Sequence, residues 1–538
     1  MSGATGHTAA AEEQGGPPAP ARRGVRGHPW LTLLTLSVGA MMVSLDGTIV
    51  TVAQPAMQAD LGASLTGIQW VTNGYLLAVA ALLIAAGRLG DRYGHRTVFL
   101  IGAAGFTATS VAIGACGSLG WVIGLRVLQG VFGALMQPAT LGLLRTAFPA
   151  EKLNMPIAVR SAVIAASTAA GPVVGGLLVE HATWSWVFFL NVPLGALALV
   201  LGVVVLHDAR AEGGRSGRLD LLGMVVLGGA LCLFVGGLAT VADRGRPDAR
   251  TTALLAAALL LGAFFVRWQR RAPDPLVPPR IFRSVRFTVG VLTMLAMSFV
   301  MFGAPFVLIF YLQNVLGLSP ADSGIRVLGL TLLMIVGAPP AAMWISRSGP
   351  RAPVVVGLLV TATAMCALSR LDAESGTLQT TLCFFLLGLG FSPVMVGATK
   401  LVISSAPVEL SGVAGGMQQT SMQVGGSLGT AVVGALVAAH AASALPGRLA
   451  AEGVVLEPGA LDEAVRTVAV GLAPDAGAVG AVGAAQATLT RIGQAVFLEG
   501  MQQALLATAA VAALGAVAGL FAGPGKAVPP GTGEGHDR

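Results

Sequence analysis

The chain has 538 residues, of which 54% are hydrophobic and 11% are charged, whereas a soluble protein carries about 25% charged residues. Together with a mean hydropathy of +0.78, this composition excludes an ordinary soluble enzyme and a disordered protein, and it indicates one large membrane-embedded body. The net charge of +7 comes from positive residues that mostly lie beside apolar runs, which indicates orientation in a membrane rather than nucleic-acid binding.

Apolar runs recur along the chain at the length of a membrane-crossing helix, which needs about 20 residues. We predict helical spans at 31–55, 66–87, 97–117, 120–147, 155–180, 184–206, 219–241, 251–268, 287–312, 322–345, 352–370, 377–404, 410–440 and 495–521. The sequence therefore predicts an all-α integral membrane protein with fourteen transmembrane helices.

The positive charges predict how these spans are oriented. With the N-terminus inside and the spans alternating, 21 of the 32 Lys and Arg residues fall on the inner side, 7 fall outside and 4 lie within spans. Cytoplasmic loops carry such an excess of Lys and Arg. We therefore expect both termini in the cytoplasm, which requires an even number of spans.

The spans group into two bundles of six helices and two extra central helices. The expected divisions are a disordered cytoplasmic tail (1–28), an N-terminal six-helix bundle (29–207), a basic loop, two extra helices and a linker (208–285), a C-terminal six-helix bundle (286–521) with an external, loosely ordered loop (441–494), and a cytoplasmic tail (522–538). The turns at 92–96 and 347–351 both read R-x-G-x-R. This repeat supports two parallel halves of six helices, which is a transporter architecture.

The turn after the second predicted span carries a dense motif. It reads GRLGDRYGHR over 87–96, where glycine permits tight backbone geometry and an aspartate among arginines suits a charge network that changes as helices move. If the turn contained only a cluster of arginines, a solvent-exposed basic turn without a gating role would be the simpler explanation. The full spacing, however, resembles motif A of the major facilitator superfamily, and we assign to this gating turn Gly87, Asp91, Arg92, Gly94 and Arg96.

Further segments resemble the fourteen-span drug:proton antiporters of that superfamily. Residues 45–55 resemble their first-helix motif, 126–133 motif B, 171–176 the antiporter motif C, 184–195 the start of their sixth helix, and 415–429 a late glycine-rich helix. The chain departs from the usual residues of these motifs at Thr51, Gln54, Ser185 and Met422.

Motif C has a physical meaning of its own. Small residues let helices approach closely, and proline removes a backbone hydrogen bond and bends the helix. A bent, close-packed fifth helix could therefore seal one side of a cavity, although membrane helices also carry glycine and proline for packing alone. The residues assigned to this antiporter motif are Gly171, Pro172, Gly175 and Gly176.

Two charges lie deep within predicted spans. Asp46 is about 22 Å along the first span, and Arg126 is about 9 Å along the fourth span, which enters from the opposite side. In a core about 30 Å thick, both would lie about 8–9 Å from the outer face, where a buried charge is costly and usually functional. We predict that Asp46 and Arg126 pair and couple proton and substrate movement, with snorkelling of Arg126 as the alternative.

The remaining intramembrane charges favour a structural interpretation. Arg160 and Lys400 are expected to snorkel at inner span ends, and Glu499 is the best second carboxylate. Glutamines within the apolar helices could contact a polar drug or join one helix to another; these are Gln129, Gln137, Gln418, Gln419 and Gln423.

The resemblance implies the major facilitator fold and export of drugs or antibiotics against proton entry. We expect an efflux transporter of the cell membrane that works by alternating access and confers antibiotic resistance by export. A phosphate-binding loop ending in G-K-[ST] is missing, because the three lysines precede Leu153, Leu401 and Ala527.

The expected partners are a small hydrophobic or amphipathic drug, protons and the lipid bilayer. We expect a monomer that is not an enzyme and has no catalytic residue, no metal, no nucleic-acid partner and no cofactor beyond the proton motive force. A proton-coupled importer and a membrane sensor on the same fold stay as alternatives. Motif C favours export, and a sensor would normally add a soluble output domain, which the sequence does not indicate.

Overall fold

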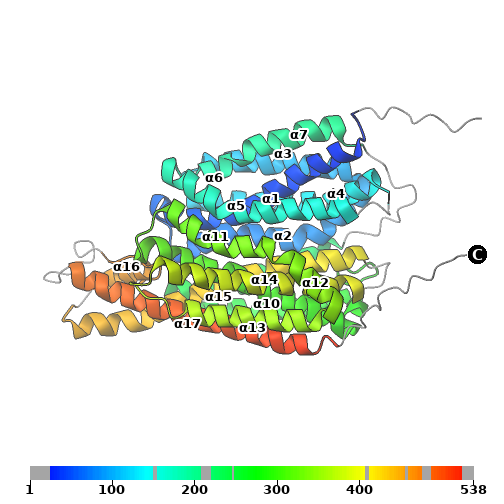
Figure 1. The fold of residues 1–538 in the computed structure, drawn as a ribbon. Coiled ribbons are helices and arrows are strands. Elements are labelled where there is room, and N and C mark those ends of the chain that lie inside the picture. Colours follow the sequence, from blue (N-terminus) through cyan, green and yellow to red (C-terminus); the bar gives the residue numbers. More distant parts are fainter. Residues whose placement is uncertain are drawn as a thin grey trace, which may run out of the picture.

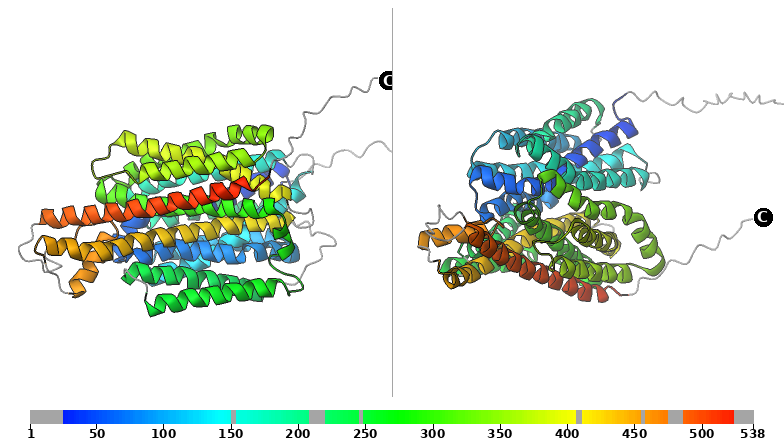
Figure 2. Two further views of the ribbon diagram at one scale, coloured as in Figure 1. Left: turned by 90° about the horizontal axis from the view of Figure 1, so that it is seen from below. Right: turned by 60° about the vertical axis from the view of Figure 1, so that its left-hand side comes forward.

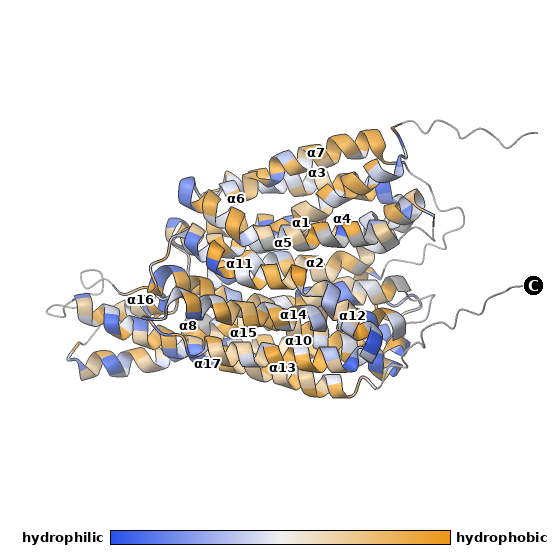
Figure 3. Cartoon of the chain, viewed as in Figure 1, coloured by the Kyte–Doolittle hydropathy of each residue, from blue (hydrophilic) through white to orange (hydrophobic). Residues whose placement is uncertain are grey.

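The computed structural model describes residues 25–149, 154–207, 220–244, 248–405, 411–454, 458–474 and 486–523. These residues form helices and connecting turns and contain no β-strand. Figure 3 shows apolar residues over the middle of the long helices and polar residues at the two ends of the bundle. This distribution suits helices that cross a membrane, since a helix satisfies its backbone hydrogen bonds internally.

Seven helices form the N-terminal half. They are α1 (Pro29–Leu61), α2 (Leu65–Tyr93), α3 (His95–Gly114), α4 (Leu119–Ala147), α5 (Asn154–His181), α6 (Trp186–Phe189) and α7 (Asn191–Val205). The short α6 and α7 together form one span. The break between them precedes Pro193, which lacks the N–H that would continue the helical ladder.

The middle of the chain adds α8 (Leu221–Arg244), α9 (Ala249–Gln269) and the short helix η2 (Pro279–Arg283). Helix α8 packs against α2 and α15, whereas α9 packs mainly against α8. In the left view of Figure 2, α8 and α9 are the green pair at the lower edge of the bundle. The two extra helices therefore flank the bundle rather than enter its centre.

The C-terminal half continues to the end of the described chain. It consists of α10 (Val285–Phe310), η3 (Tyr311–Val315), α11 (Pro320–Val336), α12 (Ala338–Ser348), α13 (Arg351–Leu368), α14 (Thr377–Ser405), α15 (Ser411–Ala451), α16 (Pro458–Val468) and α17 (Gln486–Leu520). The two halves meet where α5 packs against α11 and where α2 packs against α15.

Within the described residues, 12 helices are long and apolar enough to cross a membrane, or 13 when the bent pair of α11 and α12 counts as one span. Helix α5, several of whose side chains are not described, has 28 residues and is also long enough to span. With α5 included, the helices agree with the fourteen predicted spans.

The tenth span differs from the straight helix predicted at 322–345. It is bent by 40° between α11 and α12. The bend follows Gly337, and Pro339 and Pro340 stand in the first turn of α12. Proline has no N–H to donate to the preceding turn, so the backbone ladder is interrupted there and the helix changes direction.

The prediction of a loosely ordered loop at 441–494 is wrong for its described residues. Helix α15 continues to Ala451, α16 occupies 458–468, and α17 begins at Gln486. Residues 441–451 are rich in alanine and leucine, which favour helix. Leu449, Val468 and Ile492, from α15, α16 and α17, belong to one buried cluster, so these segments form a folded extension.

The bundle has two distinguishable ends. The first and last described residues lie at one end, called here the terminal end, and α16 projects from the other, the α16 end (Figure 1). The expected tails fall mostly on residues 1–24 and 524–538, which lie outside the described part of the chain.

One carboxylate anchors the linker that follows α9. Asp220 Oδ1 accepts hydrogen bonds from Gly223 N at 2.8 Å and Trp268 Nε1 at 2.8 Å, and Oδ2 accepts from Gln269 Nε2 at 2.7 Å and Leu276 N at 3.3 Å. Burial raises the pKa of Asp220, but these hydrogen bonds outweigh it, so the pKa lies below its ordinary value. The ionised carboxylate thus holds α8, α9 and the linker together.

Asp220→Ala should reduce the free energy of unfolding by about 1–2 kcal/mol, because a helix cap and charge-assisted hydrogen bonds are lost. Since folding lowers this pKa, the stabilisation is complete above the pKa of the unfolded carboxyl, about 3.9, and disappears as the pH falls through the folded value. Thermal unfolding in detergent should show equal deficits at about pH 6 and pH 8 and a smaller one below about pH 4. Asp220→Asn keeps a cap and should lose less. An unchanged unfolding temperature for Asp220→Ala at neutral pH would contradict this role.

Candidate functional site

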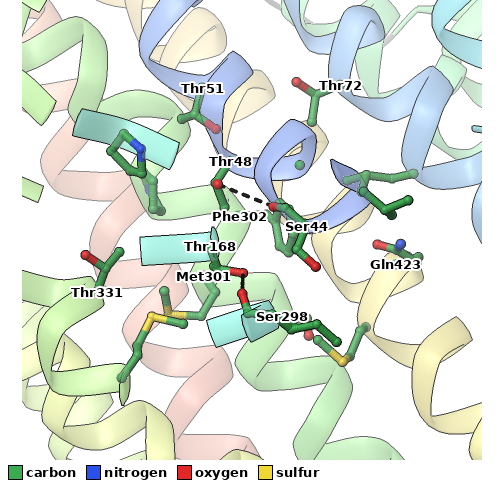
Figure 4. A pocket seen from close by; sticks show the side chains of 18 of the residues that line it. Ser44, Thr48, Thr51, Thr72, Thr168, Ser298, Met301, Phe302, Thr331 and Gln423 are labelled. Atoms are coloured by element: carbon green, nitrogen blue, oxygen red, sulfur yellow. Dashed lines mark hydrogen bonds between the residues drawn. The ribbon is translucent and has the colours of Figure 1, made fainter. Parts of the chain in front are cut away.

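A central cavity of about 460 Å³ lies between the two halves. Its walls come from α1, α2, α4 and α5 on one side and from α10, α11, α14 and α15 on the other. Figure 4 shows hydroxyl groups of α1 and α5, among them Ser44, Thr48 and Thr168, close to Met301 and Phe302 of α10. The cavity thus offers a mainly apolar surface with scattered hydroxyl and amide groups, which is the usual composition of a small-molecule site.

Glycines of the predicted antiporter motif bring α5 against α1. A Cβ added at Gly175 would lie 2.8 Å from the Ile49 carbonyl oxygen, and one added at Gly171 would meet the side chain of Thr48. Real Cβ atoms do not approach other atoms so closely. Glycine is therefore required at both positions for this helix contact, as the motif predicts.

The same motif joins the two halves at the α16 end of the cavity. A Cβ at Gly176 would lie 2.8 Å from Ala321 Cα on α11, and one at Gly324 would meet the carbonyl of Pro172. The contact is reciprocal, because each helix contributes a glycine that faces the other's backbone. Pro172 also lines the cavity, so the α5–α11 contact forms its wall on that side.

Two polar contacts support this closure. Glu180 on α5 accepts a hydrogen bond from the backbone N–H of Ala321 at 3.0 Å, and Gln313 donates to the Val52 carbonyl at 3.2 Å. Glu180 lies in the last turn of α5 and Ala321 in the first turn of α11, whereas Gln313 lies in η3 and Val52 in the second half of α1. The cavity is therefore sealed at its α16 end.

The predicted pairing of Asp46 and Arg126 is confirmed. Arg126 Nη1 lies 2.6 Å from Asp46 Oδ2, and both side chains are buried. Arg126 Nε also donates to the Val71 carbonyl at 3.1 Å. Because the guanidinium is held by two partners inside the N-terminal half, Arg126 does not snorkel.

Further donors surround the carboxylate. Gln129 Nε2 and Asn191 Nδ2 donate to Asp46 Oδ1 at 3.2 and 3.0 Å, and both amides also donate to Ser110 Oγ at 2.7 and 3.2 Å. Gln129 Oε1 in turn accepts from Arg126 Nη1 at 2.7 Å. Every described partner of Asp46 is a donor, which is the arrangement that an ionised carboxylate needs.

Tyr75 lies between this pair and the cavity. Its side chain lines the cavity, and the Arg126 guanidinium carbon lies 4.4 Å from the centroid of its ring and 5.7 Å from that of Phe188. The buried Tyr75 hydroxyl has no hydrogen-bond partner among the described residues. Tyr75 therefore adjoins both the cavity and Arg126, whereas Asp46 does not line the cavity.

The predicted gating turn has the backbone that its glycines suggest. Gly94 has φ = 90° and caps the end of α2, and Gly349 has φ = 77° and caps α12 in the corresponding turn of the other half. Glycine adopts positive φ without steric cost. The R-x-G-x-R repeat thus marks two equivalent turns at the terminal end.

The arginines of the gating turn contact backbone and aromatic groups. Arg96 Nη2 donates to the Val203 carbonyl at 3.1 Å, and the Arg92 guanidinium lies 5.4 Å from the centroid of the Tyr93 ring. The side chain of Asp91 lies outside the described part of the structure. The predicted network around Asp91 therefore stays a prediction.

One contact from this turn was not predicted. Arg88 donates to the carbonyls of Asp274 and Pro275 at 3.4 and 3.0 Å. The end of α2, which carries Gly87, is thereby joined to the linker that Asp220 anchors.

Glu499 does not lie at the cavity. Its carboxylate is 2.6 Å from Arg448 Nη2 and 3.3 Å from His440 Nε2, and its side chain is 40% exposed. These partners lie on α15, on the extension toward the α16 end. The position supports a structural pair rather than a second coupling carboxylate.

Some of the glutamines within the spans face the cavity, where they could contact a drug, and others join one helix to another. Gln137, Gln419 and Gln423 line the cavity, whereas Gln418 donates to Thr399 at 3.0 Å and joins α15 to α14. Gln54 also lines the cavity and donates to Thr72 at 3.0 Å. Sequence alone could not separate these roles, because they depend on the rotation of each helix about its axis.

Arg160, which is predicted to snorkel, instead lines the cavity. It lies six residues into α5, about 9 Å from the terminal end of that helix. Helical periodicity places Arg160 on the face of Ile164 and Thr168, which also line the cavity. That pattern is a signal that sequence reasoning missed.

A family model described as "Major Facilitator Superfamily" matches residues 36–430. The chain is 51% identical to the tetracenomycin C resistance and export protein of Streptomyces glaucescens, with 93% of this chain and 92% of that protein covered. It is 35% identical to the puromycin resistance protein pur8 of Streptomyces alboniger, with 75% and 81% covered. It is 32% identical to the multidrug efflux pump LfrA of Mycolicibacterium smegmatis, with 76% and 81% covered.

Solved structures share the fold at low sequence identity. A bacterial homologue of the human lysosomal transporter Spinster, in an inward-facing and unoccupied conformation, aligns with a TM-score of 0.62 at 16% identity over 92% of this chain and 96% of that one. The D-xylose–proton symporter aligns with a TM-score of 0.53 at 13% identity over 75% and 89%. The arrangement of helices is therefore that of these transporters.

Proposed function

The chain belongs to the major facilitator superfamily, and on this premise we propose that it exports a small hydrophobic or amphipathic antibiotic across the cell membrane by alternating access. The observation that carries the proposal is the central cavity between the two halves, closed at the α16 end by the reciprocal α5–α11 contact. A rocking motion that separates these helices would open the cavity at that end. Relatives named as resistance and efflux proteins support export as the direction.

We propose that protons drive this export through Asp46. The carboxylate is buried in the N-terminal half and paired with Arg126, while the Tyr75 ring connects the pair to the cavity. Protonation of Asp46 would release Arg126 and change the packing of Tyr75. Proton binding and drug binding would then favour different conformations, which is the linkage that antiport requires.

The proposed orientation has both termini in the cytoplasm and α16 outside. The excess of positive charges on the terminal side supports it, as does the location of both described chain ends at one end of the bundle (Figure 1). A fluorescent protein fused after Arg538 should therefore be fluorescent. A dark fusion, together with an active alkaline phosphatase at the same point, would contradict this topology.

Transport into inverted membrane vesicles tests the proposed function. Vesicles that contain the protein should accumulate tetracenomycin C or puromycin only when an inside-acid pH gradient is imposed. Collapse of the gradient with nigericin should release the drug, and addition of ATP alone should have no effect. Uptake that does not depend on the pH gradient would contradict the proposal, and so would the absence of uptake for every antibiotic tested. Movement of the drug out of the vesicles, driven by the same gradient, would indicate an importer.

A further inference from the structure

The strongest unassigned feature of the cavity is a single positive charge. Among the described residues that line the cavity, Arg160 is the only one with a charged side chain. The others are apolar residues, hydroxyl residues and amides, including Met301, Phe302 and Thr331. A guanidinium in such surroundings has lost much of its hydration, which is costly unless an anion or hydrogen-bond acceptor replaces the water.

The described carboxylates of the spans have other partners. Asp46 is paired with Arg126, Glu499 with Arg448, and Glu180 accepts from the backbone of α11. Arg160 Nε is buried and has no hydrogen-bond partner among the described residues. Its charge is therefore not balanced by any described side chain, and Asp46 and Arg126 compensate each other.

We propose that Arg160 binds an anionic oxygen of the exported molecule, so that the cavity selects apolar acids over neutral and cationic analogues. The recognised group would be a carboxylate, a phenolate or an enolate on an aromatic or other apolar skeleton. Arginine suits this role because its planar donor group makes charge-assisted hydrogen bonds to oxyanions. The Phe, Met and Tyr side chains of the lining would cover the apolar skeleton. This inference rests on the proposed function, since it names the chemical class of its substrate.

Direct binding to the purified protein tests the inference without any transport. The full chain is placed in nanodiscs of phosphatidylcholine at about pH 7.5, where a carboxylic acid is ionised, and titrated with two matched fluorescent probes, anthracene-9-carboxylate and 9-anthracenemethanol. The wild type should bind the carboxylate at least about tenfold more tightly than the alcohol. Arg160→Gln should lose this preference and bind the alcohol within about twofold of wild type, which also reports that the cavity is intact. Arg160→Lys should keep part of the preference.

Lys400→Gln is the matched control, because it removes a positive charge from a span at a side chain that is exposed and does not line the cavity. It should leave both affinities unchanged. Equal binding of the two probes by the wild type, failure of both to bind, or the same loss of preference in Lys400→Gln would each overturn the proposal. If phosphatidylglycerol in the nanodiscs abolishes the preference, an anionic lipid headgroup rather than a drug occupies the site, which overturns the proposal as well.

Failure of this inference and failure of the proposed function are distinguishable. If the probes show no acid preference while inverted vesicles still accumulate an antibiotic, only the role of Arg160 is wrong. If the acid preference is present while no pH-driven transport occurs, only the proposed transport is wrong.

Discussion

Gly176→Leu should abolish most transport while leaving the helical bundle folded. The new side chain would meet the backbone of Pro320 and Ala321, where even a Cβ would lie 2.8 Å from Ala321 Cα. Backbone atoms of a packed helix cannot move aside as a flexible side chain can. Overpacking costs about 1–3 kcal/mol, so the ratio of molecules closed at the α16 end to molecules open there should fall about 5- to 150-fold.

Two independent measurements test whether this contact closes the cavity at the α16 end. Transport into inverted vesicles reports turnover, and labelling of a Thr331→Cys cavity residue by a membrane-impermeant maleimide reports access from the α16 end. Gly176→Leu should reduce the first and increase the second, with Gly176→Ala in between. Gly124→Leu is the control, because nothing lies within 4 Å of a Cβ added there. Normal transport by Gly176→Leu with unchanged labelling would show that this contact is not the gate.

Asp46→Asn should eliminate accumulation of drug against its gradient. The variant keeps the size of the side chain, but it cannot bind and release a proton near neutral pH. It also leaves the Arg126 guanidinium buried without its anion, a change that costs about 3–5 kcal/mol for buried pairs. Asp46→Glu should retain partial activity, because its carboxylate still titrates but is displaced from Arg126, Gln129 and Asn191.

A double mutant separates coupling from simple pairing. If Asp46 and Arg126 only neutralise each other, Asp46→Asn combined with Arg126→Gln should restore transport that either single change damages. If Asp46 carries the proton, the double mutant should stay uncoupled. Asp60→Asn is the control on the same helix, because its amide oxygen can still accept the hydrogen bond that Trp184 Nε1 gives Asp60 at 2.7 Å. Proton-driven accumulation that survives in Asp46→Asn would refute the coupling role.

Much of the fold follows from one-dimensional signals in the sequence. Apolar runs predict the spans, because a helix in lipid must be apolar over a fixed length. The depth of a residue in the membrane also follows from the sequence, because a helix rises by a constant distance per residue. This calculation correctly predicted that Asp46 and Arg126 lie at the same depth. The glycines of motif C predicted a close contact, and the structure places Gly175 against α1 and Gly176 against α11.

The other features of the site depend on how each helix is rotated about its axis and on which helices it packs against. The sequence of one helix alone determines neither. Depth alone favoured snorkelling of Arg160 and did not indicate that it faces the cavity. Depth also could not bring Asn191 or Ser110 to Asp46. The extension of α15 to Ala451 was missed because polar residues interrupt the apolar run, although Leu449 packs against α16 and α17 outside the bundle. Helical segments that polar residues interrupt thus escape a search based on hydropathy.

The most direct test of the account is to measure proton movement that is driven by the drug alone. Proteoliposomes are loaded with an antibiotic that the inverted vesicles accumulate, given equal pH on both sides with the membrane potential clamped, and diluted into drug-free buffer while an internal pH dye is recorded. Antiport through Asp46 predicts that drug efflux acidifies the interior of wild-type proteoliposomes, and that Asp46→Asn proteoliposomes show no such acidification. Drug efflux through the wild type without any change in internal pH would contradict proton-coupled exchange.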